Sequence, residues 1–276
     1  MAHASGPPII TLTTDFGLSD HYVGTIKGVI LSRCPEATIV DITHDLPPFS
    51  ILAGAYAISQ AAFYFPSQTI HMIVVDPGVG TERRAILAEA GNQLFVAPDN
   101  GLLTLVLDRH KEAVVREITN RSLWLHSPSE TFHGRDIFSP VAAFLASGKA
   151  APEDVGGILE SPERFRDISP RQVHPGVWEG VVLSKDHFGN LITNFLSNTS
   201  GAKFIVDVNR HKINRFYKTF GDAPPGLPFV YHGSSGYVEI GINQQSAAQA
   251  LGVSPGDRIT MFAGEAVQSW YSSGHG

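Results

Sequence analysis

Cysteine is almost absent from this chain, which has one, Cys34, in 276 residues. A single cysteine excludes an intramolecular disulfide framework and agrees with a reducing compartment, so we expect a cytoplasmic protein. Cys34 directly precedes Pro35 at the expected end of a helix. That setting favours a small buried hydrophobic residue over a nucleophile, and we do not expect thiol chemistry.

Long apolar runs and clusters of basic residues are also missing. No apolar stretch reaches the roughly 20 residues that cross a bilayer, and the N-terminal residues lack the basic start and apolar core of a secretory signal. Lys and Arg number 20 against 26 Asp and Glu, for a net charge of −6. We therefore expect neither a membrane protein nor a nucleic-acid-binding protein.

Several common catalytic motifs are absent as well. The 12 histidines include no His-Glu-x-x-His motif and there is no cysteine pair, so we expect no metal site. Gly78 and Gly80 lack the third glycine of a dinucleotide fingerprint, and Asp76 ahead of them would repel a pyrophosphate. A Gly-x-Ser-x-Gly nucleophile elbow is missing too. These absences predict a protein without a metal or nucleotide cofactor and without a serine-hydrolase triad.

What the N-terminal half does contain is an alternation of strand-like and helix-like segments. Apolar, β-branched runs ending in aspartate alternate with segments of helical periodicity, at residues 8–17, 21–35, 37–48, 50–66 and 69–80. This order is typical of an α/β domain with a parallel sheet covered on both faces. Ligands of such folds bind outside the carboxyl ends of the strands. Asp15 and Asp76 fall at such ends and are expected to face a cleft.

The C-terminal part has a different pattern. Residues 161–176 are rich in proline and have no periodicity, which indicates a linker. Short alternating segments separated by turn residues follow and predict a mostly antiparallel β domain, either a barrel or a sandwich. The expected organisation is an α/β domain at 1–160, a linker at 161–176 and a β domain at 177–276.

Polar residues gather at the predicted turns of both domains: Asp15, Asp20, Asp76, Arg83, His133, Arg135, Asp136, Asp186 and Asn190. Singly, each has an ordinary structural explanation, since aspartate and asparagine favour turns and an arginine is often a surface charge. Jointly, their place at strand ends indicates a site. An Asp-Arg pair beside a histidine can orient an imidazole or a water molecule.

Seven short motifs together resemble the S-adenosyl-L-methionine (SAM) hydroxide adenosyltransferase family. They occur in order along both expected domains: TDFGLSDHYVG, DITHDLPPF, VVDPGVGTERR, FVAPDNGLL, FHGRDIFSP, DHFGNLITN and SSGYVEIGIN. The resemblance implies a Rossmann-like N-terminal domain, a C-terminal β domain, and a homotrimer with active sites between subunits. It also implies a metal-free hydrolase that uses in-line attack of water on C5′ to give adenosine and L-methionine.

The resemblance also assigns site residues. The catalytic triad it implies is Asp76, Arg83 and His133, which would hold the attacking water, with His133 or Asp76 as the proton acceptor. The implied substrate-binding residues come from both domains: Asp15 for the ribose hydroxyls, Asp20 for the methionine end, Phe49 packed on the ribose, Asp186 for the ammonium group, Phe188 and Asn190 for adenine, and Ser234 and Ser235 for the methionine carboxylate.

Two other functions remain open at this level. The first is a SAM-dependent halogenase, but halogenating relatives carry Tyr-Ser where this chain has His133-Gly134, and fluorinases have an inserted loop that this chain lacks. The second is a non-catalytic SAM-binding or adenosine-binding sensor. An intact triad favours an enzyme, because a pure binder has no need to orient water.

Overall fold

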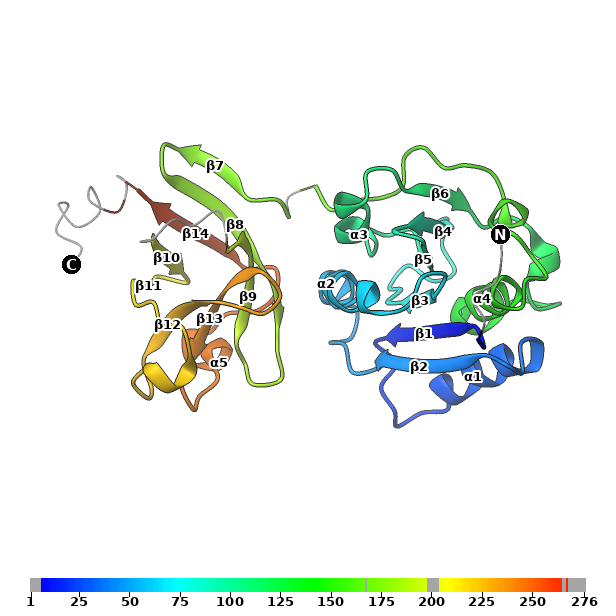
Figure 1. The fold of residues 1–276 in the computed structure, drawn as a ribbon, viewed down its shortest axis with the longest axis horizontal. Helices are drawn as coiled ribbons and strands as arrows, with labels where there is room; N and C mark the ends of the chain where they lie inside the picture. The colour runs from blue at the N-terminus through cyan, green and yellow to red at the C-terminus, as the bar shows by residue number, and fades with distance from the viewer. Residues whose placement is uncertain (1–5, 167, 198–203, 265–266, 268–276) are drawn as a thin grey trace. The chain divides into compact units, whose positions relative to one another are not determined.

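A computed structural model describes residues 6–166, 168–197, 204–264 and 267. The two compact units are Met1–Arg164, hereafter unit 1, and Phe165–Gly276, hereafter unit 2 (Figure 1). Unit 1 is mixed α/β and unit 2 is mainly β, so the expected fold class is confirmed.

Unit 1 is built on one six-stranded sheet. Its strands, in spatial order, are β2 (Thr38–Thr43), β1 (Ile9–Thr14), β3 (Ile70–Val74), β5 (Gln93–Pro98), β4 (Ala85–Ala90) and β6 (Val114–Glu117). The first four are parallel, and three of them, β2, β1 and β3, are the parallel strands that the sequence predicts, but β4 is antiparallel to both of its neighbours. Gly91 and Asn92 alone join β4 to β5, both with positive φ. A two-residue turn can connect only antiparallel strands, so the sheet is mixed rather than wholly parallel.

Helices cover both faces of this sheet. One face packs against α1 (Tyr22–Arg33) and α4 (Ser139–Ala146), and the other against α2 (Ile51–Ala61) and α3 (Thr104–Arg109). Because successive residues of a strand point to opposite faces, Met72 lies in the first of these cores and Ile73 in the second. This two-sided covering is the one expected from the continuous apolar strands. The shorter helical elements are η1 (Ala62–Tyr64), η2 (Arg121–Leu123), η3 (Gly134–Phe138) and η4 (Pro152–Val155).

Unit 2 contains one curled antiparallel sheet. The spatial order is β11 (His211–Ile213), β10 (Phe204–Val208), β14 (Arg258–Ala263), β8 (Val177–Lys185), β9 (Leu191–Leu196), β13 (Tyr237–Ile242) and β12 (Pro228–His232), with β7 (Arg171–His174) paired to β8. The end strands β11 and β12 approach each other, so the sheet is close to a closed barrel. Strand β7 lies inside the segment expected as a linker. Two short helices, η5 (Phe220–Asp222) and α5 (Ala247–Leu251), complete the unit.

Cys34 is fully buried at the C-terminal end of α1. Burial, together with a hydrogen bond that the thiol donates to the Glu36 carboxylate, raises the pKa of Cys34 to about 11. A thiol in this state is not a nucleophile at neutral pH, so the expected structural role is confirmed. Within the described ranges, no helix has both the length and the apolar character needed to span a bilayer. The cytoplasmic location stays a prediction.

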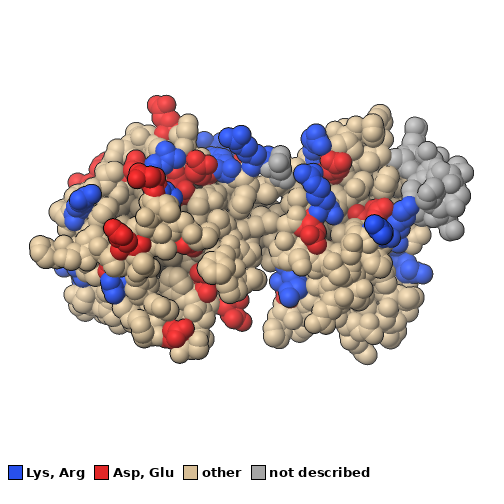
Figure 2. All heavy atoms as spheres, turned by 180° about the vertical axis from the view of Figure 1, so that it is seen from behind, with Lys and Arg blue, Asp and Glu red and all other residues tan. Residues whose placement is uncertain are grey.

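Acidic and basic side chains are interspersed on the visible face of each unit (Figure 2). On that face the described Lys and Arg side chains do not line up in a stripe of the kind that follows a nucleic-acid backbone. This distribution agrees with the modest negative net charge of −6.

His71 of β3 makes stability depend on pH. Its fully buried ring stacks on Phe95, and its Nδ1 lies 2.7 Å from Thr11 Oγ1. Burial lowers the pKa of His71 to about 4, against a smaller raising influence of the nearby Gln93 side chain. The folded state therefore keeps the ring neutral, whereas the unfolded chain takes up a proton near pH 6.5.

We expect the stabilisation that comes from keeping His71 neutral and buried to be fully present above about pH 6.5 and to be lost as the pH falls towards 4. By pH 5 the loss is about 2 kcal/mol of the free energy of unfolding. Urea titrations at pH 7 and pH 5 measure it. The variant His71→Asn, which cannot titrate, should show a smaller loss between the two pH values, whereas His126→Asn, at an exposed histidine, should keep the wild-type difference. Equal losses of unfolding free energy in all three proteins would show that His71 is not the source of this pH dependence.

Candidate active site

Asp76 lies just beyond the end of β3, and a compact loop returns the chain beside it. Within the loop, Val79 N donates to Asp76 O at 3.3 Å and Thr81 N donates to Gly78 O at 3.2 Å. Two successive turns therefore reverse the chain before β4 begins at Ala85. As a result, Arg83 returns to the carboxylate from which the loop started.

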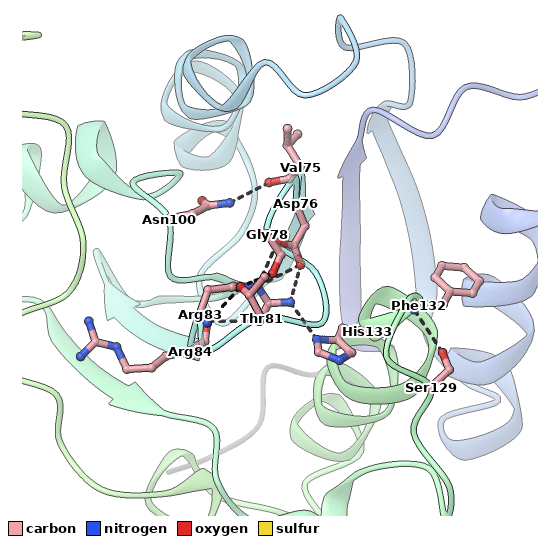
Figure 3. A network of polar contacts seen from close by, with 10 residues as sticks. All are labelled: Val75, Asp76, Gly78, Thr81, Arg83, Arg84, Asn100, Ser129, Phe132 and His133. Carbon is pink, nitrogen blue, oxygen red and sulfur yellow. Dashed lines mark hydrogen bonds and ion pairs between the residues drawn. The ribbon is translucent and has the colours of Figure 1, made fainter.

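Asp76 and Arg83 form a buried ion pair (Figure 3). The Arg83 Nε donates to Oδ1 and Oδ2 of Asp76 at 2.9 and 3.0 Å, and Nη2 also donates to Oδ2. The side chains are only 6% exposed for Asp76 and 9% for Arg83. Two charges this far from water are tolerable because they compensate each other and share several hydrogen bonds.

His133 completes this cluster. It is the N-cap residue of η3, a single π-helical turn, which is a feature often found at functional sites. Its Nδ1 lies 2.9 Å from Arg83 Nη2. Since a guanidinium can only donate, Nδ1 must accept, and the proton of the neutral ring sits on Nε2. Burial and the neighbouring Arg83 charge lower the pKa of His133, which agrees with a neutral ring at pH 7.

Arg135 and Asp136, also noted in the sequence, lie next to His133 but have a structural role. The buried Asp136 carboxylate accepts hydrogen bonds from Ser129 N and Oγ, both at 2.8 Å, and from Arg135 Nε at 2.6 Å. The Arg135 guanidinium lies over the ring of Phe132. These contacts tie the segment before His133 to the helical turn after it.

Gly80 brings the Asp76–Arg83 loop against the segment that precedes His133. Gly80 has φ +78°, and a Cβ there would overlap the carbonyl oxygen of Glu130. Only glycine satisfies both conditions, because other residues are strained in the left-handed region and add an atom where the backbone of residue 130 lies.

We expect Gly80→Ala to separate these two segments and to lower the melting temperature by several degrees, which corresponds to a cost of about 1–3 kcal/mol. The control is Gly78→Ala in the same loop, where φ is not positive and the closest atom to the new methyl group is the flexible Arg83 Cγ at 3.4 Å. Circular-dichroism melting curves compare the two. Equal melting temperatures would show that the close approach at residue 80 is unimportant.

Three predicted binding residues of unit 1 surround the ends of β1 and β2. Asp15 directly follows β1, the parallel neighbour of β3, with Thr14 opposite Val74, so Asp15 and Asp76 lie at the same edge of the sheet. Asp15 Oδ2 accepts from Phe49 N at 2.8 Å. Phe49 has φ +65° and a side chain left 72% exposed. Asp20 is exposed, two residues before α1.

Three predicted residues of unit 2 share the turn between β8 and β9. The Asp186 carboxylate is engaged within this turn, accepting from Asn190 N and from Asn190 Nδ2, both at 2.8 Å. Asn190 is buried, whereas the ring of Phe188 is 76% exposed. The turn therefore presents Phe188 outwards and uses Asn190 to orient Asp186.

Ser234 and Ser235 lie in the turn between β12 and β13, and the structure adds a residue that sequence reasoning missed. Ser235 Oγ donates to Glu239 Oε1 at 3.0 Å, and Tyr231 OH donates to Glu239 Oε2 at 2.6 Å. Ser234 is exposed. The signal for Glu239 was its place as the one charged residue in the apolar strand motif YVEIGI.

Among the described residues, no group of three or more His, Cys, Asp or Glu side chains could hold a metal ion. Three side chains that the sequence separates by up to 57 positions, Asp76, Arg83 and His133, form one hydrogen-bonded cluster. A carboxylate, a cation and a neutral imidazole together can hold a polar reactant, accept a proton and donate a hydrogen bond.

Comparisons with known proteins relate the chain to one family. The chain matches the SAM hydroxide adenosyltransferase N-terminal domain over residues 10–156 and the C-terminal domain of the same family over residues 180–260. It is 42% identical over 264 residues to an (R)-S-adenosyl-L-methionine hydrolase from Salinispora tropica, covering 93% of this chain and 98% of that protein.

More distant and structural relatives complete the comparison. A fluorinase from an Actinoplanes species is 30% identical over 294 aligned residues, covering 94% of this chain and 98% of that protein. A crystal structure of an uncharacterised conserved protein from Thermotoga maritima superimposes with a TM-score of 0.83 at 41% identity, covering 92% of this chain and 99% of that one. The chain therefore belongs to the SAM hydroxide adenosyltransferase family.

Proposed function

We propose that this protein is an enzyme that hydrolyses SAM to adenosine and L-methionine. The observation that carries this proposal is the buried cluster of Asp76, Arg83 and His133 at the carboxyl edge of the sheet. Relatives named (R)-S-adenosyl-L-methionine hydrolase, at about 42% identity over almost the whole chain, support the same reaction.

The reaction requires the enzyme to position the attacking water more than to activate the leaving group. SAM carries a sulfonium, which leaves as a neutral thioether, so the enzyme mainly has to align a water molecule with the C5′–S bond and exclude competing solvent. As the C5′–O bond forms, the C5′–S bond breaks and methionine leaves with the electron pair of that bond. One proton of the attacking water must pass to a base.

Asp76 is the proton acceptor in this proposal. The Nδ1 lone pair of His133 already accepts from Arg83, and Nε2 carries the ring proton, so His133 acts as a donor that orients the water. Oδ2 of Asp76 accepts two hydrogen bonds from Arg83, but Oδ1 accepts one, from Nε, and keeps a second lone pair for the proton of the water. Arg83 holds both partners in place through its fork of N–H groups.

The remaining predicted residues are proposed to bind the substrate. Asp15 takes the ribose hydroxyls while its Oδ2 also holds the Phe49 backbone, which sets the exposed ring against the sugar. Asp186 takes the ammonium group, oriented by Asn190. The Ser235 hydroxyl donates its hydrogen bond to Glu239, so Ser234 is the hydroxyl available to the methionine carboxylate. The other proposed contacts are Asp20 at the methionine end and Phe188 and Asn190 at adenine.

No metal is proposed to take part, because a sulfonium leaves without Lewis-acid help. Turnover should be unchanged after exhaustive treatment with EDTA. A loss of activity that is restored by a divalent cation would contradict this part of the proposal.

A halogenase is the nearest alternative, and Gly134 argues against it. A Cβ at residue 134 would lie 3.3 Å from the rings of both Phe16 and Phe132, so a serine there, as in the halogenating relatives, would require both rings to shift. The local packing therefore suits glycine after His133. This is the pair that the sequence analysis associates with water as the nucleophile.

The assembly is proposed to be a homotrimer with active sites between subunits. Size-exclusion chromatography with light scattering should give three times the chain mass of 29.8 kDa. A monomer that is fully active would overturn the proposal of shared sites.

The test of the function is product analysis. Purified protein is incubated with SAM, with and without chloride or fluoride, and the products are separated by chromatography. Adenosine and methionine in equal amounts, independent of halide, support the hydrolase. Halogenated adenosine would make the protein a halogenase, and saturable SAM binding without product would make it a sensor.

A further inference from the structure

The carbonyl of Val75, the residue directly before Asp76, is not held by the β3–β5 ladder. The parallel pairing of β3 with β5 ends at Met72, opposite Val96. The Val75 carbonyl instead accepts a hydrogen bond from the side chain of Asn100, with Nδ2 at 2.9 Å (Figure 3). An amide side chain from the loop after β5 thus continues the hydrogen bonding where the ladder stops.

The two partners of Asn100 determine the orientation of its amide. Its Nδ2 faces a carbonyl, which can only accept, and its Oδ1 accepts from Leu102 N at 3.2 Å, which can only donate. The side chain therefore bridges the loop before α3 and the end of β3. Neither an aspartate nor an aliphatic residue can make both bonds.

Close packing holds the same point from the side of α2. A Cβ at Gly54 would lie 2.7 Å from Leu102 Cδ1 and 3.1 Å from Val75 Cγ2, so this helix contacts both of the segments that Asn100 joins. Because α2 packs against Val75 and Asn100 holds the Val75 carbonyl, the backbone directly before Asp76 has little freedom to move. A catalytic carboxylate must be held to about 0.5 Å, and a displacement of about 1 Å can cost a hundredfold in rate.

We propose that Asn100 is a positioning residue that sets the place of the Asp76 carboxylate by holding the Val75 carbonyl. The proposal rests on the proposed function for its kinetic consequence. Asn100 contributes no atom to the cluster of Asp76, Arg83 and His133. It acts one residue upstream, through the main chain.

The test is Asn100→Asp, with Asn120→Asp as a matched control. The aspartate keeps the shape and still accepts from Leu102 N, but an oxygen then faces the Val75 carbonyl. Asn120 makes the same pair of bonds elsewhere in unit 1: Nδ2 donates to Asp154 O at 2.8 Å and Oδ1 accepts from Ser122 N at 3.1 Å. Both variants lose the same kind of hydrogen bond.

We expect Asn100→Asp to lower kcat at least tenfold with the KM for SAM within twofold, and Asn120→Asp to leave both within twofold of wild type. Equal kcat values in the two variants, at equal fractions folded by circular dichroism, would overturn the proposal. If Asn100→Asp does not fold, Asn100→Ala, which removes both bonds without adding a charge, is compared with Asn120→Ala in the same way.

A second readout separates this inference from the proposed function. The ¹⁵N resonance of Arg83 Nε, identified by its loss in Arg83→Lys, reports the contact with Asp76 whether or not SAM is turned over. This resonance should change its chemical shift in Asn100→Asp and keep the wild-type chemical shift in Asn120→Asp. An unchanged Arg83 signal in both variants overturns the positioning role. A shifted signal in a protein without SAM hydrolysis supports the positioning role and refutes only the function.

Discussion

Asparagine in place of Asp76 is expected to lower kcat for SAM hydrolysis by about a thousandfold, within the range of 10²–10⁴ typical of a lost general base. The amide is nearly the same shape, so the KM for SAM should change little. An amide oxygen is a far weaker base than a carboxylate, and Arg83 loses its counter-ion. Steady-state kinetics with chromatographic detection of adenosine measures both constants.

The neighbouring pair of Arg84 and Asp99 provides the control. Arg84 Nη2 lies 2.7 Å from Asp99 Oδ2, and the Asp99 side chain is 1% exposed, so Asp99→Asn also removes a buried negative charge beside an arginine. Both variants should lose stability, because removing one partner of a buried pair leaves the other uncompensated. Only Asp76→Asn should lose turnover. Similar kcat values in the two variants would remove Asp76 from the mechanism.

Removing the imidazole of His133 is expected to have the second largest effect. His133→Ala should lower kcat about a hundredfold, because Arg83 loses an acceptor and the water loses a donor. His133→Asn should recover part of this loss, since its Oδ1 takes the place of Nδ1 and accepts from Arg83. If His133 were the proton acceptor, asparagine could not replace it, and the two variants would be equally slow.

The pH profile of wild type and His133→Asn tests the same assignment. Protonation of His133 would place an N–H⁺ against the Arg83 guanidinium and break their hydrogen bond, so kcat/KM should fall as the pH falls. Burial, followed by the charge of Arg83, lowers the pKa of His133, which puts this acid limb below the ordinary histidine value of about 6.5. The limb should disappear in His133→Asn. An acid limb that is identical in both proteins would show that it belongs to another group.

The location of Asp15 and Asp76 was predictable from local sequence, and the reason is general. Apolar β-branched runs that end in aspartate form buried parallel strands, and the carboxyl ends of parallel strands meet at one edge. The structure has Thr14 opposite Val74, which places the two aspartates that follow at this edge. The direction of β4 was not predicted, because it depends on a two-residue turn at Gly91 and Asn92 rather than on periodicity.

The approach of His133 to Arg83 could not be read from periodicity or spacing, since 50 residues separate them. Only the family resemblance related them beforehand. In the structure, the Gly80 backbone passes against Glu130 and the Asp136 carboxylate ties Ser129 to the turn after His133. Such contacts arise from packing between segments distant in sequence, for which a single chain carries no local signal.

The sequence by itself determined the α/β and β character of the two units, the buried state of Cys34 and the family, because these follow from hydrophobic patterning and short motifs. Tertiary structure alone decided the finer chemistry. It showed that His133 Nδ1 accepts from Arg83, that Ser235 donates to Glu239 and that Asn100 holds Val75. Hydrogen-bond direction depends on which groups meet at about 3 Å, and that is set by packing of the whole chain rather than by neighbours along it.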